Sequence, residues 1–370
     1  MPEPLRVALS VDALGPRLTG IGRYSRELTQ RLPLDPRLAE VRFFRGRQWL
    51  ENPLALLDDR ATRPRATGRG VIAHIARRIR PPTIVHAPNY FLPVWAKPGR
   101  GVATIHDLSV FLYPETHPAE RIAAFEKHFT DTLARAALLL TDSEWNRREL
   151  IAFAGLEAHK VRAVPLGVGP EYRPRSAVEL AAPLARLGLT PGRYGLCVST
   201  LEPRKRIDCL LDAWQALPAA VRSRFPLALA GAPGWQNTNL VSRIEQARAE
   251  GWLIFLGYVP EPDLPLVHAG ARVFAYPSRY EGFGLPPLEA MASGVPTIVA
   301  PDTCVAEVTA GGARVVDVED ATRFSDALCE AIEDGSGRTG AIASGAAVAQ
   351  RYTWEACISS TIDAYQELVH

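Results

Sequence analysis

Residues 271–296 read ARVFAYPSRYEGFGLPPLEAMASGVP, and this stretch predicts a strand, a glycine-bearing loop and a helix in immediate succession. Its first six residues form a mostly apolar run of strand length, which a proline and a serine end. Gly282 and Gly284 then permit backbone conformations that residues with a side chain resist, so the loop can bring amide groups close to a ligand. Two consecutive prolines fit the first turn of the helix that follows. A strand, a glycine loop and a helix N-terminus together form a ready site for an anion.

The same stretch carries two carboxylates, Glu281 at the loop and Glu289 in the expected helix. In isolation, Glu289 would be a favourable charge near a helix N-terminus and Glu281 a solvated loop residue. A capping box is excluded, because Pro286 would occupy the cap position and has no hydroxyl. A glutamate pair is also typical of glycoside hydrolases, whose carboxyl groups lie about 5 Å or about 6.5 to 9.5 Å apart. Eight helical residues would span about 12 Å, and because the loop can shorten this distance, spacing alone leaves the chemistry open.

The whole chain has the composition of a soluble protein with two domains. Its 370 residues exceed what one hydrophobic core usually serves, and 47% of them are hydrophobic and 22% charged. No apolar run approaches the roughly 18 residues of a membrane span, and the N-terminal segment does not read as a signal peptide. We therefore expect a cytoplasmic protein. The cysteines include no CxxC pair, which favours buried free thiols over disulfides or a zinc site.

Residues 60–106 contain no Asp or Glu, and their basic side chains are interleaved with Tyr90, Phe91, Val94 and Trp95. The basic residues of this stretch are Arg60, Arg63, Arg65, Arg69, Arg77, Arg78, Arg80, Lys97 and Arg100. This composition fits a surface that meets an anionic membrane, and it fits a solvated arginine-rich face equally well. Nucleic acid is disfavoured as a partner, because no recognition helix, RNA-binding signature or zinc-finger spacing accompanies the charge.

Short apolar strands alternate with helical patterns along the chain, which predicts parallel sheets covered on both faces. We expect strands at residues 6–11, 83–86, 102–105 and 137–141, and again at 194–198, 227–230, 253–256, 273–276 and 297–300. The proline-rich residues 165–192 separate these two sets and show no strand signal. Two such sheets facing a cleft would place strand ends and helix N-termini from both halves around one ligand.

Two further segments place reactive groups where strands are expected to end. TGIGRYSREL sets Gly20 and Gly22 in a flexible loop before a helix. It is not the GxGxxG dinucleotide fingerprint, and an ordinary tight turn fits it as well. VATIHDLS puts His106 and Asp107 at a strand end, where a histidine can donate to a sugar hydroxyl or transfer a proton. A purely structural histidine is the alternative, and Asp107 would orient the ring or cap the next turn.

STLEPRKRIDCLLDAWQAL follows another expected strand and predicts a helix whose first turn carries Arg204, Lys205 and Arg206. The helix dipole disfavours each positive charge there by up to about 1 kcal/mol, and a bound anion would reverse the effect. Arginine and lysine together at a helix N-terminus therefore indicate a diphosphate site, with charge-assisted bonds of roughly 1.5 to 3 kcal/mol each. A solvated surface cluster with Asp208 as its partner is the alternative.

Taken together, these segments resemble the retaining glycosyltransferases of family 4, which use sugar nucleotides and have the GT-B fold of two Rossmann-like α/β domains facing a central cleft. The likeness covers essentially the whole chain, through TGIGRYSREL, IVHAPNY, TIHDLS, LLLTDSEWNRREL, VPLGV, STLEPRKR, LALAGAPGW, LIFLGYV, YPSRYEGFGLPPLEAMASGVP and WEACISSTIDAYQEL. It implies an acceptor-binding domain at residues 1–172, a linker at 173–192 and a sugar-nucleotide domain at 193–350. The last helix, within residues 351–370, would cross back to the first domain.

The resemblance also implies roles for individual residues. The catalytic residues would be His106, in contact with the transferred sugar near its reacting carbon, and Glu281, holding its hydroxyls. Lys205 and Arg204 would neutralise the leaving diphosphate, so that neither a metal nor another cofactor is required. The rest of the donor site would comprise Gly20 and Gly22 at the diphosphate, and Phe283, Gly284, Leu285, Glu289, Ser199 and Thr200 at the sugar and nucleotide. The acceptor side would comprise Asp107, Tyr90 and Trp95.

One position departs from the family's pattern, in which an arginine often precedes the basic motif. Here Ser199 and Thr200 stand in its place. We expect activity to survive, with more of the diphosphate contact falling on Arg204 and Lys205. A single carboxylate at the sugar favours front-face attack through an ion-pair-like transition state, and a covalent intermediate on Glu281 stays open.

The chain also resembles O-antigen and polysaccharide mannosyltransferases, which implies transfer of a hexose to a lipid-linked saccharide. The expected donor is GDP-mannose, and the expected acceptor is an undecaprenyl-diphosphate-linked saccharide at the cytoplasmic face of the inner membrane. Residues 60–100 would then give peripheral membrane association. A UDP-sugar or another GDP-sugar is the alternative donor. A non-catalytic sugar-nucleotide binder or a basic membrane-interaction protein is the alternative of another class, against which the intact Glu281, Glu289, Lys205 and His106 argue.

Overall fold

The computed structural model describes residues 5–58, 83–232, 234 and 238–369, which form two compact units. The first unit comprises Met1–Leu108, Ala123–Leu166 and Trp354–His370, and the second comprises Ser109–Ile122 and Gly167–Thr353. The predicted domain limits at residues 172, 192 and 350 stay predictions. Several predicted basic residues lie outside the described residues, namely Arg60, Arg63, Arg65, Arg69, Arg77, Arg78 and Arg80.

The first unit is built on a seven-stranded sheet in the order β3-β2-β1-β4-β5-β6-β7. Its strands are parallel except for the antiparallel pair of β2 and β3. Their bounds are β1 Leu5–Ser10, β2 Leu38–Arg45, β3 Gln48–Leu50, β4 Thr83–Ala87, β5 Gly101–Ile105, β6 Ala136–Thr141 and β7 Val161–Ala163. The four strands expected here are confirmed. β2, β3 and β7 were not predicted, because they are short or carry charged residues that interrupt the apolar pattern.

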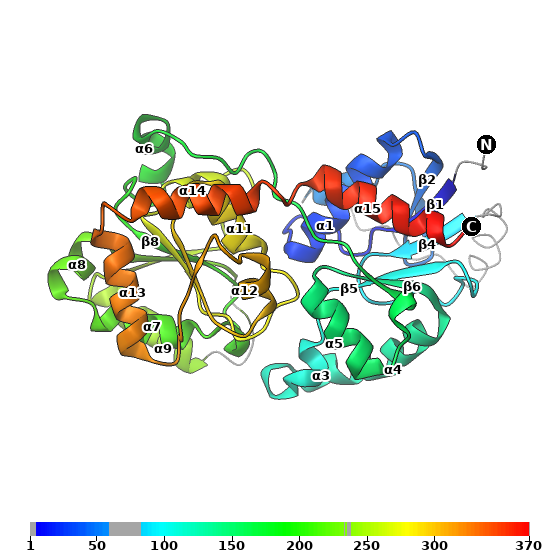
Figure 1. Ribbon diagram of the computed structural model, residues 1–370, viewed down its shortest axis with the longest axis horizontal. Coiled ribbons are helices and arrows are strands. Elements are labelled where there is room, and N and C mark those ends of the chain that lie inside the picture. The colour runs from blue at the N-terminus through cyan, green and yellow to red at the C-terminus, as the bar shows by residue number, and fades with distance from the viewer. Residues whose placement is uncertain (1–4, 59–82, 233, 235–237, 370) are drawn as a thin grey trace. The chain divides into compact units, whose positions relative to one another are not determined.

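Helices on the first unit include one from the far end of the chain. They are α1 Gly20–Arg31, α4 Ala119–Arg135, which begins within the second unit's segment, α5 Glu144–Ala154 and α15 Trp354–Glu367, with the 3-10 turns η1 Leu32–Leu34, η2 Pro53–Leu57 and η4 Ala158–Lys160. Figure 1 shows α15 beside α1, and Arg31 of α1 pairs with Glu355 at 2.6 Å. The hydroxyl of Tyr365 lies 2.6 Å from His86 Nδ1 in β4, so α15 is joined to the sheet by a buried polar contact.

The second unit has a six-stranded sheet in the order β10-β9-β8-β11-β12-β13, with parallel pairing throughout. Its strands are β8 Gly195–Val198, β9 Leu227–Ala230, β10 Leu253–Gly257, β11 Val273–Tyr276, β12 Thr297–Val299 and β13 Arg314–Val315. The five strands expected in this half are confirmed. The two-residue strand β13 was not predicted, because its residues are exposed and give no apolar run.

Helices of the second unit follow the strands in alternation. They are α3 Ser109–Leu112, α6 Ala177–Ala185, α7 Ile207–Ala216, α8 Ala219–Arg224, α9 Thr238–Ala249, α10 Leu264–Ala269, α11 Leu285–Ala292, α12 Cys304–Val308, α13 Ala321–Glu333 and α14 Arg338–Ala349, with the 3-10 turns η3 Pro114–Thr116 and η5 Pro203–Lys205. The predicted linker at residues 173–192 contains α6, which packs on α10 through buried leucines. Among the described residues, no helix has the length and apolar character needed to cross a membrane.

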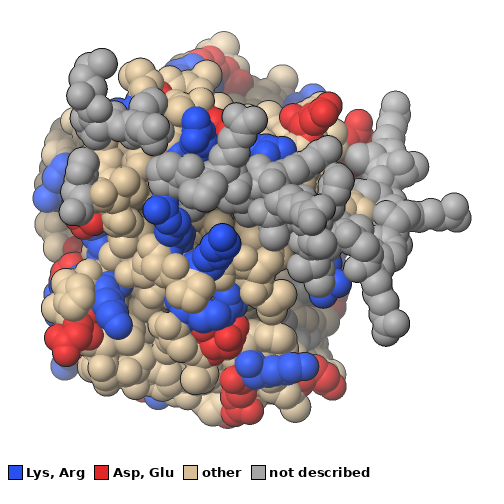
Figure 2. Space-filling view, turned by 90° about the vertical axis from the view of Figure 1, so that its right-hand side faces the viewer, with Lys and Arg blue, Asp and Glu red and all other residues tan. Residues whose placement is uncertain are grey.

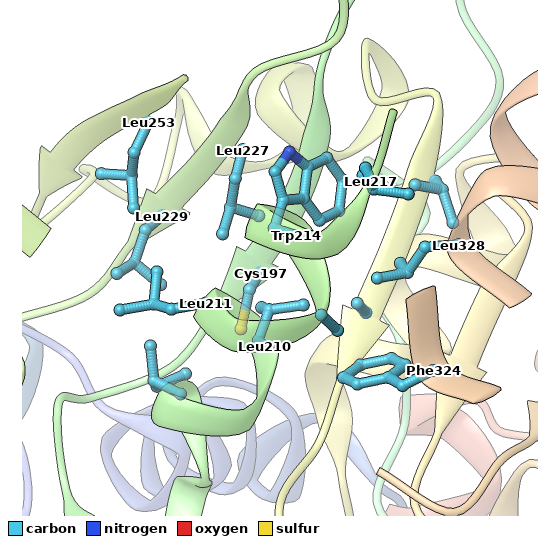
Figure 3. Close-up of a cluster of buried hydrophobic side chains, with 14 of the residues drawn as sticks. Cys197, Leu210, Leu211, Trp214, Leu217, Leu227, Leu229, Leu253, Phe324 and Leu328 are labelled. Carbon is cyan, nitrogen blue, oxygen red and sulfur yellow. The ribbon is translucent and has the colours of Figure 1, made fainter. Parts of the chain in front are cut away.

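Alternation along the strands fixes the core of this unit. Successive strand residues point to opposite faces of a sheet. Cys197, Leu227 and Leu229 therefore lie on one face, where they pack with Trp214 of α7 and Phe324 of α13 (Figure 3). All five cysteines are free, and Cys197, Cys304 and Cys357 are buried, as predicted. Polar side chains remain at the strand ends and on the surface, where Lys and Arg are spread over the face drawn in Figure 2.

Candidate functional site

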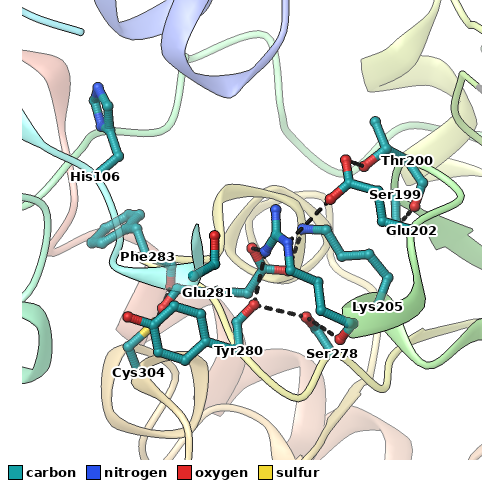
Figure 4. A network of polar contacts seen from close by, with 12 residues as sticks. His106, Ser199, Thr200, Glu202, Lys205, Ser278, Tyr280, Glu281, Phe283 and Cys304 are labelled. Atoms are coloured by element: carbon teal, nitrogen blue, oxygen red, sulfur yellow. Dashed lines mark hydrogen bonds and ion pairs between the residues drawn. The ribbon is translucent and has the colours of Figure 1, made fainter. Parts of the chain in front are cut away.

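A charged cluster lies where the strand order of the second sheet reverses. β8 and β11 are neighbours, but β8 is followed by β9 on one side and β11 by β12 on the other. Such a switch point, at the carboxyl ends of the strands, is where open α/β sheets bind ligands. Residues 199–206 follow β8 and residues 277–284 follow β11. Side chains from both segments meet in one polar network (Figure 4).

Glu281 lies at the centre of this network and is 8% exposed. Lys205 Nζ donates to its Oε1, and Arg204 Nη1 donates to its Oε2 at 3.2 Å. Tyr276, the last residue of β11, donates its hydroxyl to Oε1 at 2.8 Å. Burial alone would raise the pKa of Glu281, but the charges of Lys205 and Arg204 outweigh it and lower the pKa to about 2. Glu281 is therefore ionised at neutral pH.

The basic residues sit in a tighter turn than the sequence indicated. η5 spans Pro203–Lys205 and α7 begins only at Ile207, so the expected position in the first turn of a helix is wrong. The cause is Arg206, whose φ of 51° lies in the left-handed region and interrupts the helical path. Arg206 pairs with Glu319 at 2.5 Å and with Asp208 at 3.9 Å. The other two basic side chains instead reach the carboxylate at the centre of the network.

Glu202 was not predicted as a site residue, yet it holds Arg204 as well. Its carboxylate accepts from Arg204 Nε at 3.1 Å and from Thr200 Oγ1 at 2.8 Å, and the residue is 5% exposed. Two cations, Arg204 and Lys205, thus face two carboxylates, Glu202 and Glu281. A diphosphate entering here would compete with these carboxylates for the cations. The sequence signal that could have identified Glu202 as a site residue is its place in STLEPRKR, within one turn of Arg204 and Lys205.

The glycine loop after Glu281 is shaped for one residue type. Gly284 has a φ of 101°, and a Cβ there would lie 2.9 Å from Val305 Cγ2. Both the backbone and the packing therefore require glycine. Gly284 is also the N-cap residue of α11, and Pro286 and Pro287 in the first turn of that helix have no N–H to be capped. The thiol of Cys304 donates to the Glu281 carbonyl at 2.7 Å, which anchors the start of the loop.

The other predicted donor residues lie around this loop with different partners. Glu289 is buried on α11, with its Oε2 3.5 Å from Nε2 of His268 on α10. Phe283 and Leu285 are buried and anchor the loop. Ser199 donates its hydroxyl to the Thr200 carbonyl at 2.8 Å. Whether these residues bind sugar and nucleotide stays a prediction.

The segment Ser109–Ile122 belongs to the second unit, and its contact with the loop of Glu281 was not predicted from the sequence. The Tyr113 ring lies 5.1 Å from the Tyr280 ring, and the Arg279 guanidinium lies 4.9 Å from the centre of Tyr113. Arg279 and Tyr280 directly precede Glu281 in the chain. Tyr113 therefore packs against the segment that leads into the charged network.

In the first unit, the predicted glycine loop is part of a helix. α1 begins at Gly20, so Gly20 and Gly22 lie in its first turn, and the expected flexible loop is wrong at these positions. A Cβ at Gly22 would meet Leu18 Cδ2 at 2.9 Å and the Ala13 carbonyl at 3.2 Å, which is a packing reason for glycine. Among the described residues, no atom beyond its chain neighbours and the backbone of α1 would lie within 4 Å of a Cβ at Gly20. Contact of either glycine with a donor stays a prediction.

His106 stands directly after β5 and is held at both ring nitrogens. Nδ1 lies 2.7 Å from Asp142 Oδ2, and Nε2 lies 2.8 Å from the Pro88 carbonyl oxygen. The rings of Tyr24 and Tyr90 each meet the imidazole edge-on at 5.5 Å. Of the two roles expected for Asp107, the hydrogen bond that orients this ring comes instead from Asp142, at the end of the neighbouring strand β6. A cap on the next turn and a place on the acceptor side stay predictions for Asp107.

Tyr90 and Trp95, the other two residues predicted for the acceptor side, contact different residues of the first unit. Tyr90 is buried beside His106, with a left-handed φ of 62°. Trp95 packs its ring 4.8 Å from Phe44 and 6.2 Å from Trp49. Within the described part of the chain, no three His, Cys, Asp or Glu side chains gather as metal ligands would. The absence of a metal requirement stays a prediction.

Comparisons with known protein families divide the chain in two. The family described as Glycosyltransferase Family 4 matches residues 19–172, and the family described as Glycosyl transferases group 1 matches residues 190–346. The O-antigen chain mannosyltransferase B of Escherichia coli is 35% identical over 384 aligned positions, which cover 98% of this chain and 100% of that protein. The serotype-specific mannosyltransferase WbdA of Escherichia coli is 29% identical over 262 positions, covering 65% of this chain and 32% of that protein.

Solved structures show the same architecture. Alr3699/HepE of Anabaena, solved in complex with UDP and glucose, has a TM-score of 0.71 at 16% identity and covers 98% of this chain and 100% of that one. WaaG, a glycosyltransferase involved in lipopolysaccharide biosynthesis, has a TM-score of 0.71 at 15% identity, covering 96% of this chain and 98% of that one. The chain therefore belongs to the group 1, family 4 glycosyltransferases. The predictions of that family, of the GT-B α/β fold and of a hexosyltransferase are confirmed.

Proposed function

We propose that the chain transfers mannose from GDP-mannose to a growing lipid-linked O-antigen saccharide, with retention of configuration at the sugar. The observation that carries this proposal is the similarity to the O-antigen chain mannosyltransferase B, which extends over the full length of that protein. The likeness to Alr3699/HepE is too low in identity to favour a UDP-sugar.

The network at the switch point supplies the chemistry that such a donor needs. Arg204 and Lys205 would take the diphosphate as charge develops on it, and the main-chain N–H groups of Gly284 and Leu285, which precede the prolines of α11, would add to this stabilisation. Glu281, released from part of its pairing, would accept hydrogen bonds from hydroxyls of the sugar. The cations then do the work that a metal ion does in other transferases, so no metal is required.

Peripheral contact with the membrane that carries the acceptor would come from the loop after β4. Val94 is 73% exposed, and Lys97 is exposed three residues on. Trp95 lies between them, and Arg42 stacks over the neighbouring Trp49 at 4.6 Å. An exposed apolar residue beside cations and tryptophans suits an interface with anionic lipid.

A two-stage assay tests the proposal. Melting temperature is measured with GDP-mannose, UDP-glucose, ADP-glucose and dTDP-glucose, since a bound donor stabilises the folded state in proportion to its affinity. The donor that raises it most is then incubated with a lipid-linked saccharide, and the anomeric configuration of the product is read by NMR. We expect GDP-mannose and an α-linked mannose. A larger shift with UDP-glucose would overturn the donor assignment, and a β-linked product would overturn retention.

A further inference from the structure

We propose that Asp142 is a positioning residue that keeps His106 doubly protonated, so that the ring acts as a fixed hydrogen-bond donor and not as a base. This inference rests on the proposed function only where it concerns transfer activity. The protonation state itself is a property of the first unit and is measured without substrate.

The two contacts of the ring fix its protonation. The Pro88 carbonyl can only accept, so Nε2, at 2.8 Å, must carry a proton. Burial raises the pKa of Asp142, while the charge and the hydrogen bond of His106 oppose that rise. We infer that Asp142 is ionised; it can then only accept, and Nδ1, at 2.7 Å, carries a proton too. A ring that donates at both nitrogens is an imidazolium. His106 and Asp142 are 6% and 3% exposed, so little water competes with either bond.

The surroundings of the ring contain several other titratable groups. Tyr24 from α1 and Tyr90 from the loop after β4 are buried and face it edge-on, and burial raises the pKa of Tyr24 well above its usual value. Burial and the charge on His106 lower the pKa of His86 in β4, so His86 is neutral near pH 7, while Asp142 and Asp107 favour the charge on His106. Burial by itself lowers the pKa of His106, but the carboxylate of Asp142 outweighs burial and raises it above its usual value.

The corner between β6 and α5 is built to hold this arrangement. Ser143 caps α5 by accepting from the Asn146 amide at 3.1 Å, which fixes the chain just after Asp142. Asn146 in turn donates its side-chain amide to the His106 carbonyl. Residues of this one corner therefore hydrogen-bond both the ring and the main chain of His106. Asp142, held at the end of the adjacent parallel strand, thus fixes the position of the ring as well as balancing its charge.

The consequence concerns what His106 can do to a substrate. A donor sugar hydroxyl or a phosphate oxygen could replace the Pro88 carbonyl and accept from the same Nε2–H. A proton from the acceptor hydroxyl could not be taken up, because neither nitrogen has a lone pair. The proton released in the transfer must then pass to another group.

Histidine labelled with 15N and transverse-relaxation-optimised NMR test this inference on the full chain. The His106 signals are assigned by their loss in His106→Gln. In the wild type we expect both ring nitrogens to be protonated at pH 7. In Asp142→Asn, we expect the ring to lose its second proton at a pH lower by about one unit or more. A neutral ring in the wild type, or an unchanged titration in Asp142→Asn, would overturn the proposal, and the wild-type spectrum decides even if the variant unfolds.

Kinetics separate positioning from folding. Asp142→Asn should lower kcat about 10- to 150-fold, as expected for the loss of one charge-assisted hydrogen bond, with the KM for the donor changed less than about threefold. Glu144→Gln is the matched control, since Glu144 is exposed at the first position of α5, two residues after Asp142, and pairs with Arg147 at 2.8 Å. An equal loss in both variants would contradict the proposal. If the wild type transferred no mannose, the proposed function would fail while the NMR titration still stood as the test of Asp142.

Discussion

The two units each bury charge at the carboxyl ends of parallel strands, but they compensate it in different ways. In the second unit Glu281 faces Lys205 and Arg204, whose charges persist across the physiological pH range. In the first unit Asp142 faces His106, whose charge depends on one proton. The first arrangement suits the recognition of a permanent anion, whereas the second holds a proton on His106 and keeps the ring a hydrogen-bond donor. The contrast teaches that similar sheet edges in one chain can serve anion binding and hydrogen-bond donation separately.

The largest expected effect comes from removing the carboxylate of the second unit. Glu281→Ala would leave Lys205 and Arg204 buried without their shared partner, which should lower the free energy of unfolding by about 3–5 kcal/mol. The exposed pair of Arg314 and Glu330 supplies the control, because Glu330→Ala should cost about 1 kcal/mol or less. Urea denaturation followed by tryptophan fluorescence measures both. Equal losses would mean that the buried network contributes no more than a surface pair.

The next prediction concerns His86 of β4, whose lowered pKa should make the stability of the first unit depend on pH. Burial lowers its pKa to about 3, so the folded state binds no proton at His86 while the unfolded chain begins to do so below about pH 6.5. A depressed pKa makes stability fall as pH falls, here by about 2 kcal/mol between pH 7.5 and 5. His86→Gln should lack this part of the pH dependence. Parallel stability curves for wild type and variant over this range would refute the assignment.

In the second unit, the stability that Glu281 contributes should be lost at a lower pH than the stability that depends on His86. The pKa of Glu281 falls from its usual 4.5 to about 2, so the stability it contributes is complete above pH 4.5 and is lost as pH falls towards 2. The stability difference between wild type and Glu281→Gln should therefore shrink by about 2 kcal/mol between pH 4.5 and 3. Denaturation midpoints across this range provide the measurement. A difference that changed near pH 6 instead would point to a histidine.

The smallest expected effect concerns the glycine loop. Gly284→Ala meets both a left-handed backbone and the Val305 side chain, whereas Gly251→Ala meets the same type of backbone, with a φ of 81°, and no neighbour within 4 Å. The first variant should be less stable than the second by about 1 kcal/mol. Thermal unfolding compares them. Equal melting temperatures would show that Val305 yields without cost.

Much of this architecture was predictable from the sequence, because apolar runs indicate the buried strands and glycine and proline indicate where elements end. The strands that escaped, such as β7 and β13, are short and partly exposed, so burial leaves little pattern on them. The pairing of Glu281 with Lys205 joins residues 76 positions apart, and it depends on β8 and β11 being neighbours. Composition and spacing do not reveal that neighbourhood.

The residues that sequence reasoning missed share one property, which is that they act through a partner from another element. Asp142 reaches His106 from the end of the adjacent strand, and Glu202 reaches Arg204 through a turn that the sequence pattern predicted as helix. The left-handed Arg206 that makes this turn has no sequence signature, because arginine rarely adopts that conformation. Such contacts follow from tertiary packing.

The most direct test of the central claim, that Arg204 and Lys205 hold the donor diphosphate, is a calorimetric titration of GDP into the wild type, Lys205→Ala and a control, Lys127→Ala. Lys127 is an exposed residue of α4. The account predicts that Lys205→Ala raises the Kd about 10- to 150-fold while Lys127→Ala leaves it unchanged. The same Kd for GDP in all three proteins would contradict it.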